Sequence, residues 1–402
     1  MQRNLRPRLA AVVLCVVLLA ACGGQPTAPP AQVPVPGGSE SAPEPVEPEP
    51  PEPPAPEPQP WDDMTLPEGC DAAWSVSEEG GLILTHYDTG SRADAALPQG
   101  RPYQIAAKCL AGNRTLQSIV IPADVTAVGA GAFANCTALR SVRFEGTLPQ
   151  LPARCFTGCS ALEEIVLPQG LTCLGMQAFS GCSSLNTLQL PAALREIGQA
   201  AFETCTSLSA LTFPETLESI GAAAFRNTRL RAVELPLGLK QLGAGAFAEN
   251  PVLEQVVFRG SPQAGTALFS ECTQLQQILL PAAWTALPEG TFSGCAALKT
   301  LDLPAALRII GPQAFAESGL EQIFLPEGVT EIGELAFGGC VHLAVVCLPG
   351  SLQAVGELAF SGCPLQTVWY AGTDWPGLLA CCQPGNEALE KAELRAGRPP
   401  LG

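Results

Sequence analysis

Residues 162–182 read LEEIVLPQGLTCLGMQAFSGC, and this arrangement of leucine, proline, glycine and phenylalanine returns along most of the chain. A degenerate first unit has Leu110 in the phenylalanine position and Asn113 in the cysteine position. A fixed period of this length is typical of a repeat solenoid, whose units bury their apolar side chains only against their neighbours. The phenylalanine recurs every 22 or 23 residues, at positions 133, 156, 179, 202, 225, 247, 269, 292, 315, 337 and 360.

Each unit carries one strand signal. Ile165 and Leu167 flank an outward residue, which is the period of a β-strand with one buried face, and Pro168 then ends the hydrogen-bond ladder. Gly175 marks a tight corner, and Phe179 is expected to pack inward from a short helical or 3-10 turn. The sequence therefore predicts a solenoid of about twelve units, each with one short parallel β-strand. A bend is expected in the units that lack an Ile-Gly corner, which end at Phe156, Phe269 and Phe292.

The composition excludes several functional classes. The 402 residues include 38 acidic and 21 basic side chains, four of them lysine, for a net charge of −17. A nucleic-acid-binding protein needs a basic face for phosphates, so we expect no nucleic-acid partner. His86 and His342 are the two histidines, and no nucleophile–base pair, phosphate-binding loop or calcium loop stands out. We therefore expect no catalysis, no cofactor and no metal site.

The N-terminus reads as an export signal. Arg3, Arg6 and Arg8 precede an apolar run of 13 residues, which is too short to span a bilayer. The run ends in Leu-Ala-Ala-Cys at residues 19–22, which resembles the lipobox of bacterial lipoproteins. This resemblance implies that Cys22 is lipidated and anchors the chain to a membrane at the extracytoplasmic face of the cell envelope. The alternatives are an ordinary signal peptide cleaved nearby or an uncleaved anchor.

A proline- and glutamate-rich linker follows the lipidation position. Fifteen of the residues between Pro26 and Pro60 are proline, and the interspersed charges are all acidic. Such a segment cannot bury a core, so we expect a disordered, extended spacer rather than a ligand for a proline-binding module. The predicted organisation is a signal peptide at 1–21, the lipidated cysteine and linker at 22–60, a β-hairpin cap at 61–104, the solenoid at 105–370, and a C-terminal cap and tail at 371–402.

The repeat motif carries a family resemblance. The pattern L-x-x-[IVL]-x-L-P-x-x-L-x-x-[IL]-G-x-x-A-F-x-x-C resembles the BspA-like leucine-rich repeats of bacterial surface lipoproteins. The flanks resemble the caps of such arrays, with Trp74 in a short hairpin before the repeats and Trp369 and Trp375 after them. The resemblance implies surface display, adhesion, and binding of proteins or glycans, with no ligand common to the family.

Eight cysteines lie three residues after a repeat phenylalanine, and Thr228, Asn250 and Ser318 fill that position in other units. Exchange among Cys, Asn, Ser and Thr indicates a small side chain that hydrogen-bonds the backbone of the turn, so we expect free structural thiols. A disulfide ladder or a bound metal are the alternatives. Better candidates for oxidised pairs are Cys70 with Cys109, and the adjacent residues 381 and 382. The ladder cysteines are Cys136, Cys159, Cys182, Cys205, Cys272, Cys295, Cys340 and Cys363.

The outward residue of each strand defines the candidate binding face. Several of these residues are apolar, although an outer strand side that meets only water is usually polar. β-Propensity alone is the alternative explanation. The residues we predict to bind ligand are Arg143, Val257, Leu279, Phe324 and Trp369.

The sequence thus predicts a membrane-anchored, surface-displayed leucine-rich repeat protein that binds extracellular proteins or glycans without catalysis. The first alternative is a structural or self-associating component of the cell envelope that has no soluble ligand. The second is an enzyme with its site in residues 61–105, a segment that is poor in titratable pairs.

Overall fold

The computed structural model describes residues 59–398. The expected signal peptide, Cys22 and nearly all of the linker lie outside these described residues. Within residues 59–398, no helix is both long enough and apolar enough to cross a membrane.

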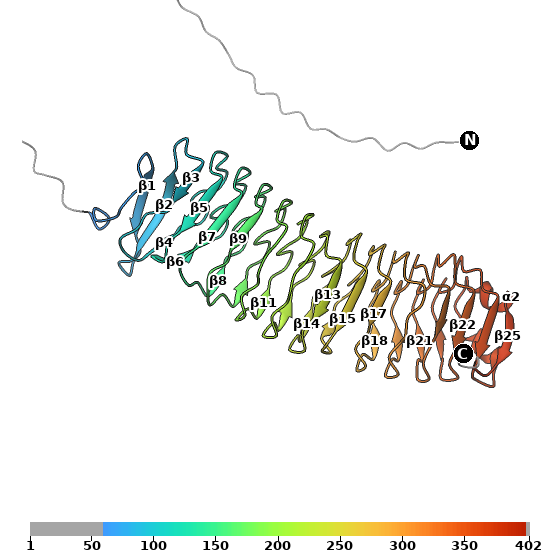
Figure 1. Cartoon of the computed structure of the whole chain (residues 1–402). Coiled ribbons are helices and arrows are strands. Elements are labelled where there is room, and N and C mark those ends of the chain that lie inside the picture. Colours follow the sequence, from blue (N-terminus) through green and yellow to red (C-terminus); the bar gives the residue numbers. More distant parts are fainter. Residues whose placement is uncertain (1–58, 399–402) are drawn as a thin grey trace, which may run out of the picture. The chain divides into compact units, whose positions relative to one another are not determined.

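The described residues form a parallel β-solenoid of about 14 turns, which confirms the predicted fold and roughly matches the predicted count of twelve units. Two rows of parallel strands run along it (Figure 1). The strands expected at residues 188–190, 211–213 and 301–303 do not form. The first strand face contains the other nine predicted strands and one further strand at each end. These are β3 (Asp94–Ala96), β5 (Ser118–Ile121), β7 (Ser141–Phe144), β9 (Glu164–Val166), β13 (Ala232–Leu235), β15 (Gln255–Phe258), β17 (Gln277–Leu279), β20 (Gln322–Phe324), β22 (Val345–Leu348), β24 (Thr367–Tyr370) and β25 (Glu393–Ala396).

The second strand face was not predicted. It forms at the corner of each unit. There one outward residue and one buried aliphatic residue make a short strand, which pairs in parallel with the equivalent strand of the next unit. Most of these strands have two residues, too few to give an alternating pattern. They are β4 (Tyr103–Ile105), β6 (Val125–Val128), β8 (Gln150–Leu151), β10 (Cys173–Leu174), β11 (Glu196–Ile197), β12 (Ser219–Ile220), β14 (Gln241–Leu242), β16 (Gln263–Ala264), β18 (Ala286–Leu287), β19 (Ile309–Ile310), β21 (Glu331–Ile332) and β23 (Ala354–Val355).

The corner glycine holds adjacent turns together. Its N–H donates to a carbonyl of the preceding unit, as from Gly221 to Ile197 at 2.8 Å. A Cβ on Gly221 would lie 2.4 Å from a backbone nitrogen of that unit, so a larger residue does not fit. Proline replaces this glycine at Pro152 and Pro288 and has no N–H to donate. The second strand face is interrupted at these two units, whereas Gly265 keeps the ladder intact in the unit that ends at Phe269.

A run of turns replaces the expected helical segment around each phenylalanine. In one unit Gln177 and Gly181, two residues before and two after Phe179, have φ values of 56° and 78°. Left-handed residues at this spacing interrupt a right-handed helix, so the chain makes consecutive hydrogen-bonded turns.

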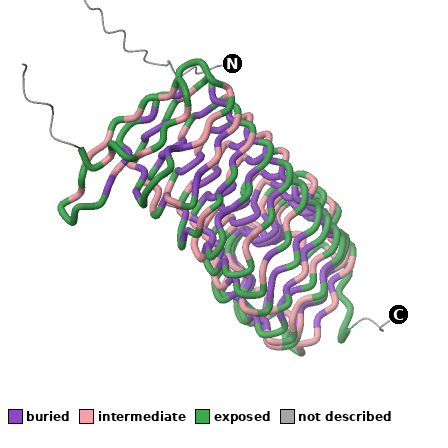
Figure 2. Tube along the Cα trace, turned by 60° about the vertical axis from the view of Figure 1, so that its left-hand side comes forward, coloured by how far each residue is buried: buried purple, intermediate pink, exposed green. Residues whose placement is uncertain are grey.

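The core is a ladder of phenylalanine rings. The eleven repeat phenylalanines are fully buried, and consecutive rings stack with centroids 5.1–6.0 Å apart. Figure 2 shows buried residues following the inside of the coil along the whole array. Because each internal ring contacts the rings of both neighbouring units, the core is continuous through the repeats.

Both ends of the array are covered. At the N-terminal end β1 (Asp71–Val76) and β2 (Leu82–Asp88) form an antiparallel hairpin, and β2 pairs with β4. At the C-terminal end α1 (Trp375–Ala380) and α2 (Glu387–Lys391) bury Leu378 and Leu389, and β25 adds a strand beside β24. These elements shield the last units of the core from water.

The first strand face opens in two places, between β9 and β13 and between β17 and β20. Within the described residues, backbone groups 186–190, 209–213 and 300–303 have no hydrogen-bond partner. In these three segments the first inward residue is leucine (Leu188, Leu211 and Leu301), whereas in the nine internal strands that pair it is valine or isoleucine. β-Branched side chains favour the extended backbone, which explains why the leucine segments do not pair.

Candidate binding face

The structure places all five predicted ligand-binding residues on the first strand face but does not gather them into one patch. Val257 and Leu279 are paired neighbours in β15 and β17, and Leu279 is 64% exposed. Phe324, 42% exposed, begins the next group of paired strands, and Trp369 lies two strands further on. Arg143 is distant from these residues in β7, where it forms an ion pair with Glu145 at 2.7 Å.

The C-terminal segment covers part of this apolar row. The guanidinium of Arg395 lies 5.5 Å from the ring centroid of Trp369, and Arg398 forms an ion pair with Glu327 at 3.0 Å. Cys347, between Phe324 and Trp369 in the row, is only 1% exposed. The contact between Arg398 and Glu327 could not be predicted from the repeat, because the two residues are 71 positions apart.

Three depressions lie along the first strand face. One of 620 Å³ is bordered by Val166, Gln189 and Thr212, and one of 320 Å³ by Thr212, Glu234 and Arg259. The third, of 310 Å³, is bordered by Gln277, Leu279, Thr300 and Asp302. Each adjoins a segment in which the sheet is open, so the hollows follow from the missing strand pairs.

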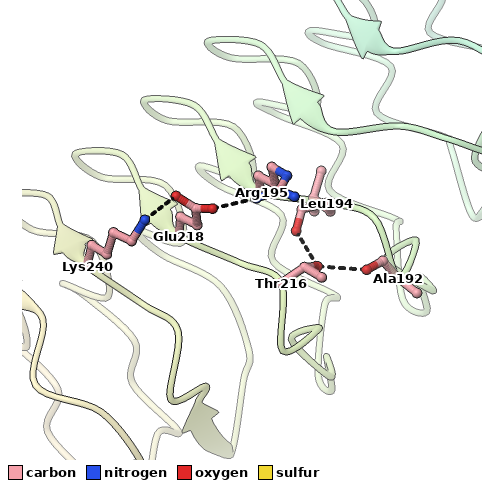
Figure 3. A network of polar contacts seen from close by, with 6 residues as sticks. All are labelled: Ala192, Leu194, Arg195, Thr216, Glu218 and Lys240. Carbon is pink, nitrogen blue, oxygen red and sulfur yellow. Dashed lines mark hydrogen bonds and ion pairs between the residues drawn. The ribbon is translucent and has the colours of Figure 1, made fainter.

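Surface charges pair mainly between neighbouring units. The carboxylate of Glu218 contacts Arg195 and Lys240, each at 2.6 Å, beside the second strand face (Figure 3). These contacts, that of Lys240 first, hold the pKa of Glu218 below its ordinary value. In the same view the Thr216 hydroxyl contacts the carbonyl oxygens of Ala192 and Leu194. These contacts link adjacent repeats and leave no concentration of unpaired charge there.

The ladder cysteines point into the core. Each thiol donates a hydrogen bond to a backbone carbonyl of the preceding unit, as from Cys182 to Phe156 at 3.2 Å. Burial raises the pKa of Cys205 and of Cys272 to about 12, so these thiols stay protonated at neutral pH. A protonated, buried thiol is a poor nucleophile and a poor metal ligand. All cysteines within residues 59–398 are free thiols, including Cys70, Cys109, Cys381 and Cys382.

Asn250 takes the cysteine position and makes more contacts than a thiol. Its amide nitrogen donates to the carbonyls of Phe225 and Phe247, at 2.8 and 2.7 Å. Its oxygen accepts hydrogen bonds from the backbone and hydroxyl of Thr228, at 2.9 and 2.5 Å. One buried amide therefore links two consecutive units.

Within the described residues, no cluster of His, Cys, Asp or Glu is arranged to hold a metal ion. His86, in β2, and His342, in a turn, are both exposed. Neither is part of a hydrogen-bonded pair of a nucleophile and a base in this part of the chain.

The comparisons with known proteins agree with the repeat geometry. Residues 103–206, 149–272 and 263–373 match the family described as BspA type Leucine rich repeat region. No curated protein matches the sequence. Among solved structures, a leucine-rich repeat protein from Bacteroides ovatus ATCC 8483 is 24% identical with a TM-score of 0.56, and the match covers 82% of this chain and 98% of that one.

Two further structures match over similar lengths. A leucine rich cell surface protein from Faecalibacterium prausnitzii A2-165 is 23% identical with a TM-score of 0.47, and the match covers 77% of this chain and 96% of that one. The pneumococcal vaccine antigen PcpA is 15% identical with a TM-score of 0.50, and the match covers 84% and 99%.

A leucine-rich repeat solenoid is typically a non-catalytic binding scaffold, and the family suggests an interaction or adhesion role at the bacterial cell surface. The period of the motif, the stacked phenylalanines and the family match all lead to one assignment. The chain belongs to the BspA-type leucine-rich repeat family.

Proposed function

We propose that this chain is a membrane-anchored surface protein that binds extracellular proteins or glycans through its first strand face and catalyses no reaction. The observation that carries the proposal is the apolar row of Val257, Leu279 and Phe324, in which Leu279 and Phe324 are exposed and which lies beside open depressions. Exposed apolar side chains on a solenoid face are where partners commonly dock. The lipidation sequence around Cys22 supports an anchor in the membrane, and the linker supports display at a distance from it.

Binding of the full chain to an array of extracellular proteins and glycans tests this function. We expect a saturable ligand whose binding is abolished by Phe324→Asp or Leu279→Asp, because a charge would have to be buried in the contact. The matched control is Val341→Asp, which changes an equally exposed apolar residue that is in neither strand face. Binding that survives both face substitutions would place the site elsewhere.

Metabolic labelling with palmitate tests the anchor. The chain is expected to incorporate the lipid, and Cys22→Ser is expected to remove both the label and the membrane association. Unlabelled chain in the membrane fraction would instead favour an uncleaved leader.

Self-association is the alternative function, and the terminal strands argue against its simplest form. Asp94 in β3 and Glu393 in β25 occupy the same position of the repeat at the two ends of the first strand face. Head-to-tail pairing of two copies in register would therefore bring two carboxylates together. Sedimentation velocity of the full chain distinguishes the two functions, because a concentration-dependent assembly would favour the structural role.

A further inference from the structure

The 310 Å³ depression combines two kinds of surface. Gln255, Gln277 and Thr300 line it with uncharged amide and hydroxyl groups, and Asp302 adds a carboxylate. Leu279 supplies an exposed aliphatic surface on one side. The aromatic ring of Phe324 is exposed in the strand that follows Asp302 in the array.

Backbone groups at this depression also lack hydrogen-bond partners within the described residues. Residues 300–303 pair with neither β17 nor β20, so they leave unpaired N–H and C=O groups on both sides. The facing edges of β17 and β20 lack strand partners as well. In an extended segment these groups point along the sheet towards the neighbouring units, so the hydrogen-bonding groups that face a ligand are those of the side chains.

The spacing of the units does not admit an inserted peptide strand. Phe292 stacks between Phe269 and Phe315 with centroid distances of 5.8 and 5.5 Å. Neighbouring strands in a sheet are about 4.8 Å apart, so an added strand would need roughly twice the observed separation. A bound ligand therefore lies on the outside of the face, where the side chains project.

The charges disfavour an acidic ligand. Asp302 has no ion pair in the described part of the chain, and the nearby Lys299 is paired with Glu321 at 2.9 Å. An acidic ligand would approach an unpaired carboxylate on a chain of net charge −17. A ligand rich in hydroxyl groups can donate to Asp302 and exchange hydrogen bonds with the side-chain amides and the Thr300 hydroxyl.

We infer that this depression, with Leu279 and Phe324 beside it, binds an uncharged oligosaccharide. The hydroxyl groups would meet Gln277, Thr300 and Asp302, and the C–H faces of the sugar rings would pack on the apolar side chains. This inference rests on the proposed function, since it names the ligand class and the site within the first strand face.

Calorimetry on the full chain tests the inference with maltohexaose, cellohexaose and mannohexaose as uncharged probes and hexagalacturonate as the acidic one. At least one uncharged probe is expected to bind saturably, and hexagalacturonate at least tenfold more weakly. Asp302→Ala and Phe324→Ala are each expected to lower the affinity roughly tenfold, the loss typical of a hydrogen bond to a charged group or of a buried ring. Gln263→Ala, on the second strand face, is the control and should change the affinity less than twofold.

The outcomes separate this inference from the proposed function. Failure of all uncharged probes at 10 mM, or equal affinity for hexagalacturonate, would overturn the inference. Tighter binding of hexalysine, lost in Asp302→Asn, would assign the depression to a basic polypeptide instead. If a protein ligand is lost in Phe324→Asp while no saccharide binds, the proposed function stands and the saccharide site does not. If nothing binds the face, both fail.

Discussion

The substitution Leu301→Ile should close the opening between β17 and β20. Leu301 is the first inward residue of the unpaired segment 300–303, where the internal paired strands have valine or isoleucine. Leucine and isoleucine have the same volume, so the change alters backbone preference more than packing. The resulting strand would pair with both neighbours and continue the first strand face across this unit.

The size of the effect follows from the unpaired groups. A strand of this length forms about two hydrogen bonds on each side, and each is worth about 1 kcal/mol net. Ordering two or three residues costs a similar amount per residue. The local gain is therefore about 1–2 kcal/mol, which corresponds to roughly 5- to 30-fold slower amide exchange in residues 300–303.

Hydrogen exchange followed by mass spectrometry measures this protection directly. Leu307→Ile is the matched control, because Leu307 is also buried in this unit but lies outside the strand position. The reverse change, Ile278→Leu, should open β17 and speed exchange there. Unchanged exchange in Leu301→Ile, or equal slowing in Leu307→Ile, would refute the link between the inward residue and strand pairing.

Four further outcomes are expected. Asn250→Ala should lower the free energy of unfolding by about 3–5 kcal/mol in urea titrations, because it leaves several buried backbone groups unpaired, whereas Asn250→Cys should cost less than half as much. Gly221→Ala should cost about 1–3 kcal/mol in the same assay, since its Cβ would overlap the preceding turn. Burial raises the pKa of Cys205 from 9.0 to about 12. The contribution of the protonated thiol to the free energy of unfolding is therefore complete below pH 9 and is lost as the pH rises towards 12. Cys205→Ser should make this alkaline loss of stability shallower. Arg395→Ala should expose Trp369 and red-shift its fluorescence, and an unshifted spectrum would mean that the guanidinium does not cover the ring.

The repeat itself could be predicted from the sequence because a solenoid makes long-range contacts periodic. Phe179 packs on Phe156 and Phe202, which lie one period away on either side, so the stacking partners are visible as a spacing. The same reasoning locates the first strand face, whose strands have a buried residue on either side of an exposed one.

Contacts that do not follow the period could not be found this way. Arg398 reaches Glu327 across two strands, and nothing in the spacing of the two residues relates them. At the candidate site the row of outward residues could be predicted from the sequence. The gaps in strand pairing beside that row could not. These depend on whether leucine or a β-branched residue comes first in the strand, a distinction that hydrophobic periodicity does not make.

The two strand faces open at different units. Where the first face opens, between β9 and β13 and between β17 and β20, the second face is continuous through β8 to β16 and β18 to β23. Where Pro152 and Pro288 interrupt the second face, β5 to β9 and β15 to β17 keep the first face paired. Every junction between repeats therefore retains at least one ladder, together with the stacked core inside it. This alternation explains how the chain can leave backbone groups unpaired on a candidate binding face while the array remains a single body.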